Sequence, residues 1–212
     1  MRPKIAVVTA SLGGFDTKQD HEKQAVACDF VHLTDKEFPP RTAAMTPRLQ
    51  ARLAKMTGWQ LVPDYEYYLW LDSSCKLTKS NSVEWFMEQL GDADFATFKH
   101  PHRKTVQEEA DYLRHRLKIN CPYVTPRYAN ERLDDQMAVV EPDDPLYATT
   151  AIIYKNDTPA RDLLTIWWLH TSMYHTNEQL SLQTAVRHSG ATINVIPDNY
   201  LKCDYIEYVR NQ

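Results

Sequence analysis

The feature that most constrains the fold is an uninterrupted apolar run, Tyr67–Leu71, that is followed at once by Asp72. Such a run is typical of a strand that is buried on both faces of a sheet. A carboxylate at the end of a buried strand is costly unless a ligand, a cation or several hydrogen-bond donors stabilise it. The run therefore predicts a buried strand that ends at a site, with a simple turn contact of Asp72 as the alternative.

Strands and helices alternate along the rest of the 212-residue chain, which predicts one α/β domain with parallel strands at the centre of its sheet. Residues 120–145 carry four prolines and are expected to form loops or short helices. The other expected strands are 5–9, 30–33, 95–98, 146–154 and 192–196, and the expected helices are 46–57, 81–91, 105–118, one that begins at 159, and 177–190.

Residues typical of helix ends mark these boundaries. Pro47 suits a first helical position and Gly58 a C-terminal cap. Capping boxes are predicted at Asn81 and Thr105, because a glutamate follows each of them three residues later. Asn177 is expected to cap the last helix.

Composition excludes several other classes of protein. Hydrophobic residues make up 43% and charged residues 25% of the chain, which is the balance of a folded domain. No apolar stretch is long enough to span a membrane, and the first residues lack the apolar length and cleavage site of a signal peptide. The four cysteines lie far apart, which argues against a disulfide framework or a zinc ribbon. We therefore expect a soluble, cytoplasmic protein.

Polar residues follow most of the expected strands. Ligands of open α/β sheets bind at the carboxyl ends of the strands, so these residues predict an enzyme or a ligand-binding protein. The strand ends are Thr9–Ser11, Thr34–Asp35, Asp72–Ser74, Lys99–His100 and Tyr154–Asn156.

Three cations of the helix 46–57 are expected to lie on one helical face. Arg48, Arg52 and Lys55 are spaced four and three residues apart, which brings their side chains together. A row of this kind suits the diphosphate of a nucleotide, since guanidinium groups bind phosphate oxygens in a fixed geometry. The alternative is a basic face that only meets solvent.

Two further segments carry residues suited to chemistry. In Lys99–Lys104, His100 and Arg103 are expected to contact phosphate or sugar, while His100 and His102 could instead begin the metal site of a metal-dependent hydrolase. Glu178 is either a general base or acceptor-binding carboxylate, or a first-turn residue that complements the helix dipole.

The order of these motifs resembles a known family, the glycosyltransferase-like group that was first catalogued as a domain of unknown function and includes plant proteins linked to cell-wall mucilage and pollen development. The resemblance implies a GT-A-like, Rossmann-like mixed sheet flanked by helices in a single domain, and sugar transfer from a nucleotide sugar. The fragments that carry it are Ala6–Asp16, Cys28–Asp35, Pro47–Lys55, Tyr68–Asp72, Lys99–Arg103 with Glu108–Glu109, and Trp167–Trp168 followed by Glu178–Ser181.

The resemblance also implies roles for individual residues. Asp72 matches the first carboxylate of a D-x-D motif and would be the ligand of Mn²⁺ or Mg²⁺, but Ser74 replaces the second carboxylate, and a hydroxyl is a poor sole anchor for a divalent cation. Ala148 stands where the family tends to carry an acidic residue. The implied donor-side residues are Thr9, Asp16 and Asp35 near the nucleoside, Arg48, Arg52 and Lys55 at the diphosphate, Asp72 and Ser74 at the D-x-D position, and His100 and Arg103 at the sugar. Glu109, which would also border the sugar, Glu178 and Gln179 are implied on the acceptor side.

We therefore expect a transferase that moves a sugar from a nucleotide sugar, with UDP as the commonest donor nucleotide, to a hydroxyl of a glycan acceptor. Asp72 and Glu178 are the expected catalytic carboxylates, residues 1–100 the nucleotide-binding part and residues 101–212 the acceptor side. A hydroxylated DNA base ranks below a glycan, because the net charge is −4 although Lys99–Lys104 and Arg114–Lys118 are basic. The alternatives are the hydrolase and a non-catalytic nucleotide-sugar-binding module.

Overall fold

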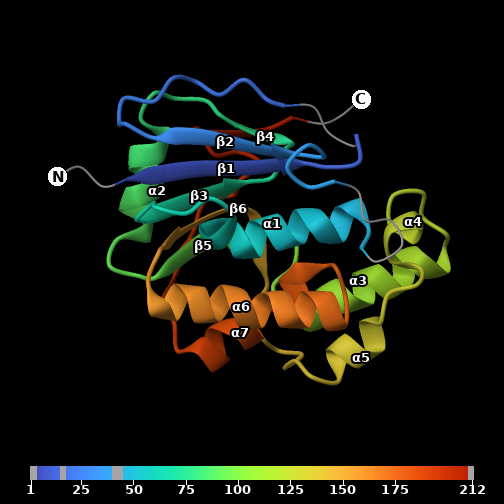
Figure 1. Cartoon of the computed structure of the whole chain (residues 1–212). Helices are drawn as coiled ribbons and strands as arrows, with labels where there is room; N and C mark the ends of the chain where they lie inside the picture. Colours follow the sequence, from blue (N-terminus) through green and yellow to red (C-terminus); the bar gives the residue numbers. More distant parts are fainter. Residues whose placement is uncertain (1–3, 15–17, 40–44, 210–212) are drawn as a thin grey trace.

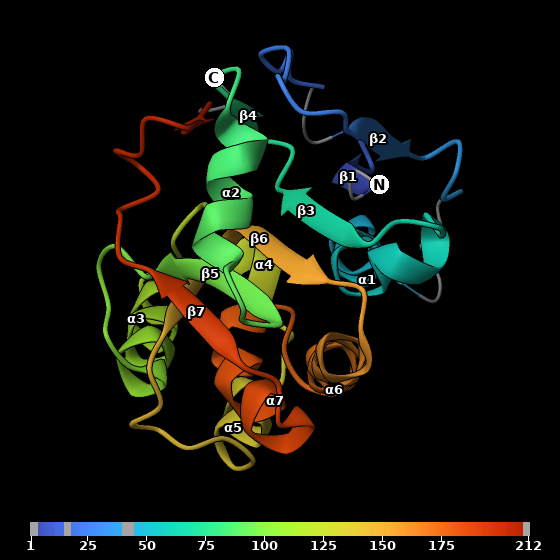
Figure 2. The ribbon, with the colours of Figure 1, turned by 90° about the vertical axis from the view of Figure 1, so that its left-hand side faces the viewer.

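A computed structural model describes residues 4–14, 18–39 and 45–209 of the chain. Six strands form one mixed sheet in the order β2-β1-β3-β6-β5-β7; the first five of this order are labelled in Figure 1 and β7 is labelled in Figure 2. A separate pair, β4 (Cys75–Leu77) and β8 (Ile206–Tyr208), is antiparallel. The strands of the large sheet are β1 (Ile5–Ser11), β2 (Asp29–Thr34), β3 (Tyr67–Leu71), β5 (Phe95–Lys99), β6 (Tyr147–Lys155) and β7 (Ile193–Ile196).

Helices cover both faces of this sheet (Figure 2). On one face, α1 (Pro47–Leu61), α6 (Thr158–Met173) and α7 (Leu182–Ser189) pack through the buried side chains of Met56, Leu163, Trp167 and Leu182. On the other face, α2 (Ser82–Leu90) packs through Val83, Phe86 and Leu90 together with the β4–β8 pair. The expected α/β fold, a mixed sheet flanked by helices, is thus confirmed.

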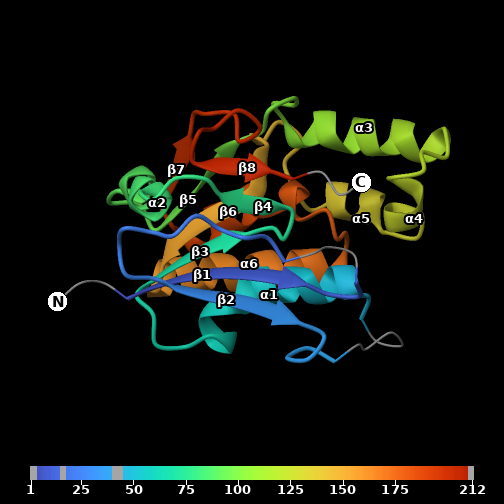
Figure 3. The ribbon, with the colours of Figure 1, turned by 90° about the horizontal axis from the view of Figure 1, so that it is seen from above.

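A third apolar cluster lies beyond one end of the sheet, where α3 (Val106–Lys118), α4 (Thr125–Tyr128) and α5 (Leu133–Met137) gather (Figure 3). This is the end at which β1 and β3 finish (Figure 1). The proline-rich stretch forms short helices and loops, as expected. Across the described ranges, the structure has no helix that is both long and apolar enough to cross a membrane.

The prediction of parallel strands at the centre is wrong for β6. This strand runs antiparallel to both of its neighbours, β3 and β5, although β1 is parallel to β2 and β3. Its carboxyl end, Tyr154–Asn156, therefore lies at the opposite edge of the sheet from Asp72. The first half of β6 meets Asp72 instead, and the backbone N–H of Asp72 donates to the carbonyl of Thr150 over 2.8 Å. An apolar run contains no signal for strand direction, which explains the error.

Two predicted helix boundaries are also wrong. Gly58 does not end α1, which continues with a kink at Thr57 to Leu61. A Cβ at Gly58 would lie 3.2 Å from the hydroxyl oxygen of Tyr154, so this glycine permits a close approach of helix and sheet. Asn177 does not begin a long helix either; a short 3₁₀ helix, η1 (Glu178–Leu180), precedes α7.

The two predicted capping boxes differ in the structure. Thr105 caps α3, because its side-chain oxygen accepts the backbone N–H of Glu108 over 3.2 Å. Asn81 stands at the N-cap of α2 but makes no capping hydrogen bond with its side chain. Of the two predicted caps, only the hydrogen bond of Thr105 should therefore contribute to stability.

We expect Thr105→Ala to lower the free energy of unfolding by about 1 kcal/mol, since a capped helical N–H loses its acceptor. For a chain of this size the melting temperature should fall by about 2–4 °C. Asn81→Ala, a matched change at an uncapped helix end, should alter the melting temperature far less. Equal effects of the two variants in thermal unfolding would contradict this difference.

Candidate functional site

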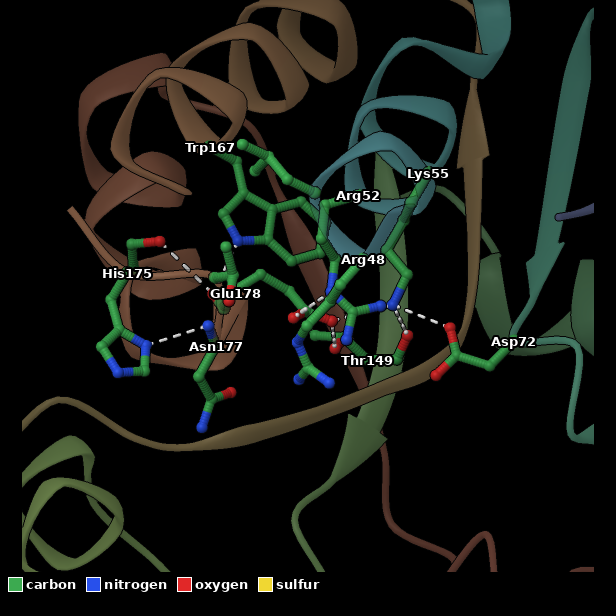
Figure 4. A network of polar contacts seen from close by, with 12 residues as sticks. Arg48, Arg52, Lys55, Asp72, Thr149, Trp167, His175, Asn177 and Glu178 are labelled. Atoms are coloured by element: carbon green, nitrogen blue, oxygen red, sulfur yellow. Dashed lines mark hydrogen bonds and ion pairs between the residues drawn. The ribbon is translucent and has the colours of Figure 1, made fainter. Parts of the chain in front are cut away.

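Charged side chains gather at the carboxyl end of β3, where α1, β6 and η1 meet (Figure 4). We call Arg52, Lys55, Asp72 and Glu178 the ion cluster. Lys55 is fully buried, and its Nζ lies 3.0 Å from Oδ1 of Asp72 and 2.9 Å from Oε1 of Glu178. It also donates to the backbone carbonyl of Thr149 over 2.9 Å. An ammonium has three N–H donors, so these three acceptors match its full capacity.

Glu178 is the buried carboxylate of the ion cluster, with a side chain that is 3% exposed. Its Oε2 lies 2.6 Å from Nε of Arg52, and its Oε1 accepts the hydroxyl of Thr149 over 2.9 Å. Burial by itself raises the pKa of Glu178, but Arg52 and Lys55 outweigh burial and lower this pKa to about 2. A carboxylate with so low a pKa and with both oxygens beside cations is a poor proton acceptor, and these contacts suit a positioning role.

Asp72 is the more accessible carboxylate, with a side chain that is 28% exposed. Its Oδ1 accepts the indole N–H of Trp70 over 2.9 Å in addition to facing Lys55. The buried strand end is thus stabilised by a cation and a donor, as the cost of burying a carboxylate requires. Of the two predicted catalytic carboxylates, Asp72 is the one that a ligand can reach.

Arg48 lies one helical turn before Arg52 and extends the row of cations away from Lys55 (Figure 4). Its guanidinium donates to the hydroxyl of Tyr128 and lies 4.6 Å from the centroid of that ring. Tyr128 in turn stacks on His175, with ring centroids 4.9 Å apart. Burial and the neighbouring Arg48 lower the pKa of His175 to about 4, so this ring is neutral at pH 7. The three cations lie together as their spacing predicts, and the alternative of a solvent-facing basic row is wrong.

Glu109 connects the loop after β5 to the segment before η1. Arg103 donates to its Oε2, and the side-chain amide of Asn177 donates to its Oε1 over 2.7 Å. Arg103 also lies over the ring of Tyr112, with 4.1 Å from its guanidinium carbon to the ring centroid. This side of the site is therefore held by a second buried carboxylate, Glu109, whose partner Asn177 directly precedes Glu178 in the chain.

His100 does not form part of a metal site in the described residues. Its Nδ1 accepts the backbone N–H of Arg103 over 2.9 Å, and its Nε2 lies 3.5 Å from the guanidinium of the same residue. Burial, Arg103 and His102 lower the pKa of His100 to about 4. Nowhere in residues 4–14, 18–39 and 45–209 do three or more His, Cys, Asp or Glu side chains form a group that could hold a metal. The hydrolase alternative has no ligand set there.

Three more predicted residues, Thr9, Asp35 and Ser74, belong to or follow β1, β2 and β3, which are parallel and end at the same edge of the sheet. Thr9 is a buried residue of β1. Asp35 follows β2, and its carboxylate oxygens accept the N–H of Gly13 over 3.0 and 3.1 Å, which fixes the turn after β1. Ser74 follows β3, where its carbonyl accepts the N–H of Val209. Half-buried Gln179 lies in η1, and Asp16 lies outside the described residues.

Several residues of the site carry no clear sequence signal. Tyr128 comes from a short helix inside the proline-rich stretch, and His175 from the loop before η1. Their contacts to Arg48 arise only from tertiary packing. Thr149 is different, because it interrupts the apolar run of β6 with a polar residue that could have marked the strand's approach to the site.

Glu178→Gln is expected to lower the free energy of unfolding at pH 7 by about 3 kcal/mol or more, because it leaves buried cations without their partner. The pKa of Glu178 is about 2 in the folded protein against a usual 4.5. The ionised form therefore stabilises the fold above pH 4.5, and this contribution disappears as the pH falls toward 2.

Urea unfolding at pH 7 and at about pH 3 should thus show a smaller difference between Glu178→Gln and the parent protein at the lower pH. Glu88→Gln changes an exposed glutamate of α2 and serves as the control, with little effect at either pH. A difference that stays constant with pH would refute the assignment of the ion pair.

Comparisons with known proteins agree with this architecture. The model of the TOD1/MUCI70 glycosyltransferase-like domain matches residues 41–212. Among solved structures, the fold is similar to the crystal structure of a glycosyltransferase involved in the glycosylation of the major capsid of PBCV-1. That match has a TM-score of 0.54 and 12% sequence identity, and it covers 99% of this chain and 96% of that chain. At such an identity it supports the fold alone.

No curated protein matches the sequence significantly. The family match begins at residue 41, so the fragments that resemble the family at Ala6–Asp16 and Cys28–Asp35 lie outside the matched segment. The segment nevertheless includes the whole ion cluster and far more than half of the chain. The chain therefore belongs to the TOD1/MUCI70 glycosyltransferase-like family.

Proposed function

We propose that this protein is a glycosyltransferase that binds the diphosphate of a nucleotide sugar beside the ion cluster. The observation that carries this proposal is the unequal charge at the carboxyl end of β3. Among the described residues, Arg52 and Lys55 are paired there with two carboxylates, Asp72 and Glu178, while Arg48 lies next to them and contacts Tyr128. Arg48 is the surplus cation; it is half-buried at the outer end of the row, and the phosphate is proposed to approach there. Preorganised positive charge is well suited to the charge that develops on a leaving diphosphate.

The nucleoside is proposed to bind next to the turn after β1, with UDP as the favoured nucleotide. Thr9 and Asp35 lie at this part of the sheet edge, and the Asp35 contact holds the backbone of Gly13 in place. Gly13 and Gly14 both adopt positive φ, which lets the backbone turn sharply without side chains in the way. This arrangement is suited to a close approach of a flat ring. Asp16 stays a sequence-based candidate for the same subsite.

In the proposed reaction, the bond between the anomeric carbon and the diphosphate oxygen breaks as an acceptor hydroxyl forms a new bond to that carbon. The diphosphate leaves with the bonding electrons, and Arg48 and Arg52 stabilise its charge. Asp72 accepts the hydrogen bond of the acceptor hydroxyl and takes its proton. Glu178 keeps Arg52 and Lys55 in position. His100, Arg103, Glu109 and Gln179 are proposed to border the sugar and the acceptor.

A glycan acceptor fits the surface charges better than a nucleic-acid acceptor. Arg103 is paired with Glu109, and Arg114 is paired with Asp111 and with Asp134. These contacts neutralise part of both basic segments within the protein. Nucleic acid binding depends on cations that are available to neutralise phosphates.

Nucleotide binding gives the first test. Isothermal titration of UDP, GDP, CMP and dTDP should identify one nucleotide that binds, and Arg48→Ala or Arg52→Ala should each weaken its binding at least about tenfold, because a charged hydrogen bond contributes roughly 1.5–3 kcal/mol. Arg161→Ala is the matched control, since Arg161 contacts Asn156 at the opposite edge of the sheet. Unchanged affinity in Arg48→Ala, or no binding of any nucleotide, would refute the proposal.

Turnover gives the second test and separates a transferase from a non-catalytic binding module. With the matching nucleotide sugar and a panel of glycan acceptors, Asp72→Asn should reduce release of the nucleoside diphosphate by about 10²-fold or more while nucleotide affinity changes little. The near-isosteric amide keeps hydrogen-bonding capacity but cannot take a proton at neutral pH. If the parent protein binds the donor but releases no nucleoside diphosphate with any acceptor, the transferase proposal is wrong and the protein is a non-catalytic binding module.

A further inference from the structure

We propose that Lys55 takes the place of a divalent cation at Asp72, so that the protein binds its donor diphosphate without a metal ion. This inference rests on the proposed function for its ligand and on the ion cluster for its geometry. The Nζ of Lys55 lies 3.0 Å from Oδ1 of Asp72, which is ion-pair distance to the carboxylate that a D-x-D motif would offer to a metal.

The carboxylates at this point already have their counter-ion. Lys55 comes from the middle of α1 and reaches between β3 and β6 with no exposed surface. Its ammonium faces Asp72, Glu178 and the carbonyl of Thr149 at 2.9–3.0 Å. The ammonium thus supplies the positive charge that two neighbouring carboxylates need.

A metal at the same oxygen of Asp72 would be close to this ammonium. Divalent cations bind carboxylate oxygens at about 2.0–2.6 Å, so an ion on Oδ1 would lie within roughly 5–6 Å of Nζ. The two cations would repel each other next to a buried site, where charge interactions are poorly screened. No second carboxylate offsets this repulsion at the D-x-D position, because Ser74 supplies only a hydroxyl there. The residues around Asp72 therefore do not fit a divalent cation.

In this proposal the diphosphate is bound by Arg48 and Arg52, which lie nearer the N-terminus of α1 than Lys55. Lys55 has its donors directed at protein acceptors, so it organises the site and does not reach the ligand. Arg52 meets Glu178 through Nε, and its side chain is 15% exposed. The terminal nitrogens of a guanidinium are the pair that binds phosphate oxygens side by side. Arg52, together with Arg48 one helical turn away, can thus neutralise the negative charge of the diphosphate, as a divalent cation does in metal-dependent enzymes.

The first experiment uses the full-length protein and the nucleotide selected by the titration above. Its dissociation constant in EDTA should agree within about twofold with that in millimolar Mn²⁺ or Mg²⁺, since no metal contributes to binding. Affinity that appears only with Mn²⁺, or rises tenfold or more with it, would overturn the inference. The absence of nucleotide binding under both conditions would instead overturn the proposed function, and the second experiment needs no nucleotide.

The second experiment adds Mn²⁺ alone. It should leave the melting temperature of the parent protein unchanged. Lys55→Met removes the ammonium but keeps the apolar stem, and this variant should be stabilised by Mn²⁺, because Asp72 and Glu178 have lost the cation that they share. Lys155→Met, at the opposite edge of the sheet, is the control and should not respond.

The inference would be overturned if a folded Lys55→Met variant keeps the same melting temperature with and without Mn²⁺, or if the parent protein binds Mn²⁺. If Lys55→Met does not fold, electron paramagnetic resonance of Mn²⁺ titrated into the parent protein decides the question by itself. A free-ion spectrum throughout that titration supports the inference, and loss of signal at one equivalent refutes it.

Discussion

The contact between Lys55 and Glu178 is the interaction on which the site depends. A buried ammonium and a buried carboxylate are each costly alone and become tolerable only as a pair with further hydrogen bonds. Here the pair joins α1 to η1 through two residues that are 123 positions apart, while Thr149 of β6 and Asp72, directly after β3, add acceptors. Four segments that are distant in sequence are therefore held at one point by a single side chain. Any ligand at this edge of the sheet meets a preorganised set of charges.

The direction of β6 determines which polar residues take part in this arrangement. Because β6 is antiparallel to β3, Thr149 and Thr150 lie near Asp72, while Asn156 lies at the opposite edge and donates to the carbonyls of Tyr65 and Glu66. The expectation that polar residues at carboxyl strand ends meet at one edge of the sheet thus holds for β1, β2 and β3 and fails for β6. It failed because burial on both faces removes the alternation of polar and apolar residues, and composition alone does not indicate direction.

The parts of the site that sequence predicts are those set by local geometry. Helical spacing brings Arg48, Arg52 and Lys55 together, and a carboxylate after an apolar strand marks Asp72. The contacts of Tyr128 and His175 depend on how an irregular, proline-rich segment folds back over α1, and no periodic pattern encodes that. Most strand and helix positions were also predictable, because they too follow from local sequence patterns. Helix caps such as Asn81 were not, because a capping contact of a side chain competes with its contacts to solvent.

The two carboxylates of the ion cluster show how surroundings divide roles between chemically similar groups. Glu178 is enclosed by Arg52, Lys55 and Thr149, which keeps it ionised far below neutral pH and engages both of its oxygens. Asp72 shares the same ammonium but remains 28% exposed. A group that must exchange a proton or bind a hydroxyl needs access, whereas a group that must hold cations in place benefits from burial. The environment of each carboxylate, more than its residue type, therefore suits Asp72 to the proposed contact with substrate and Glu178 to holding the cations in position.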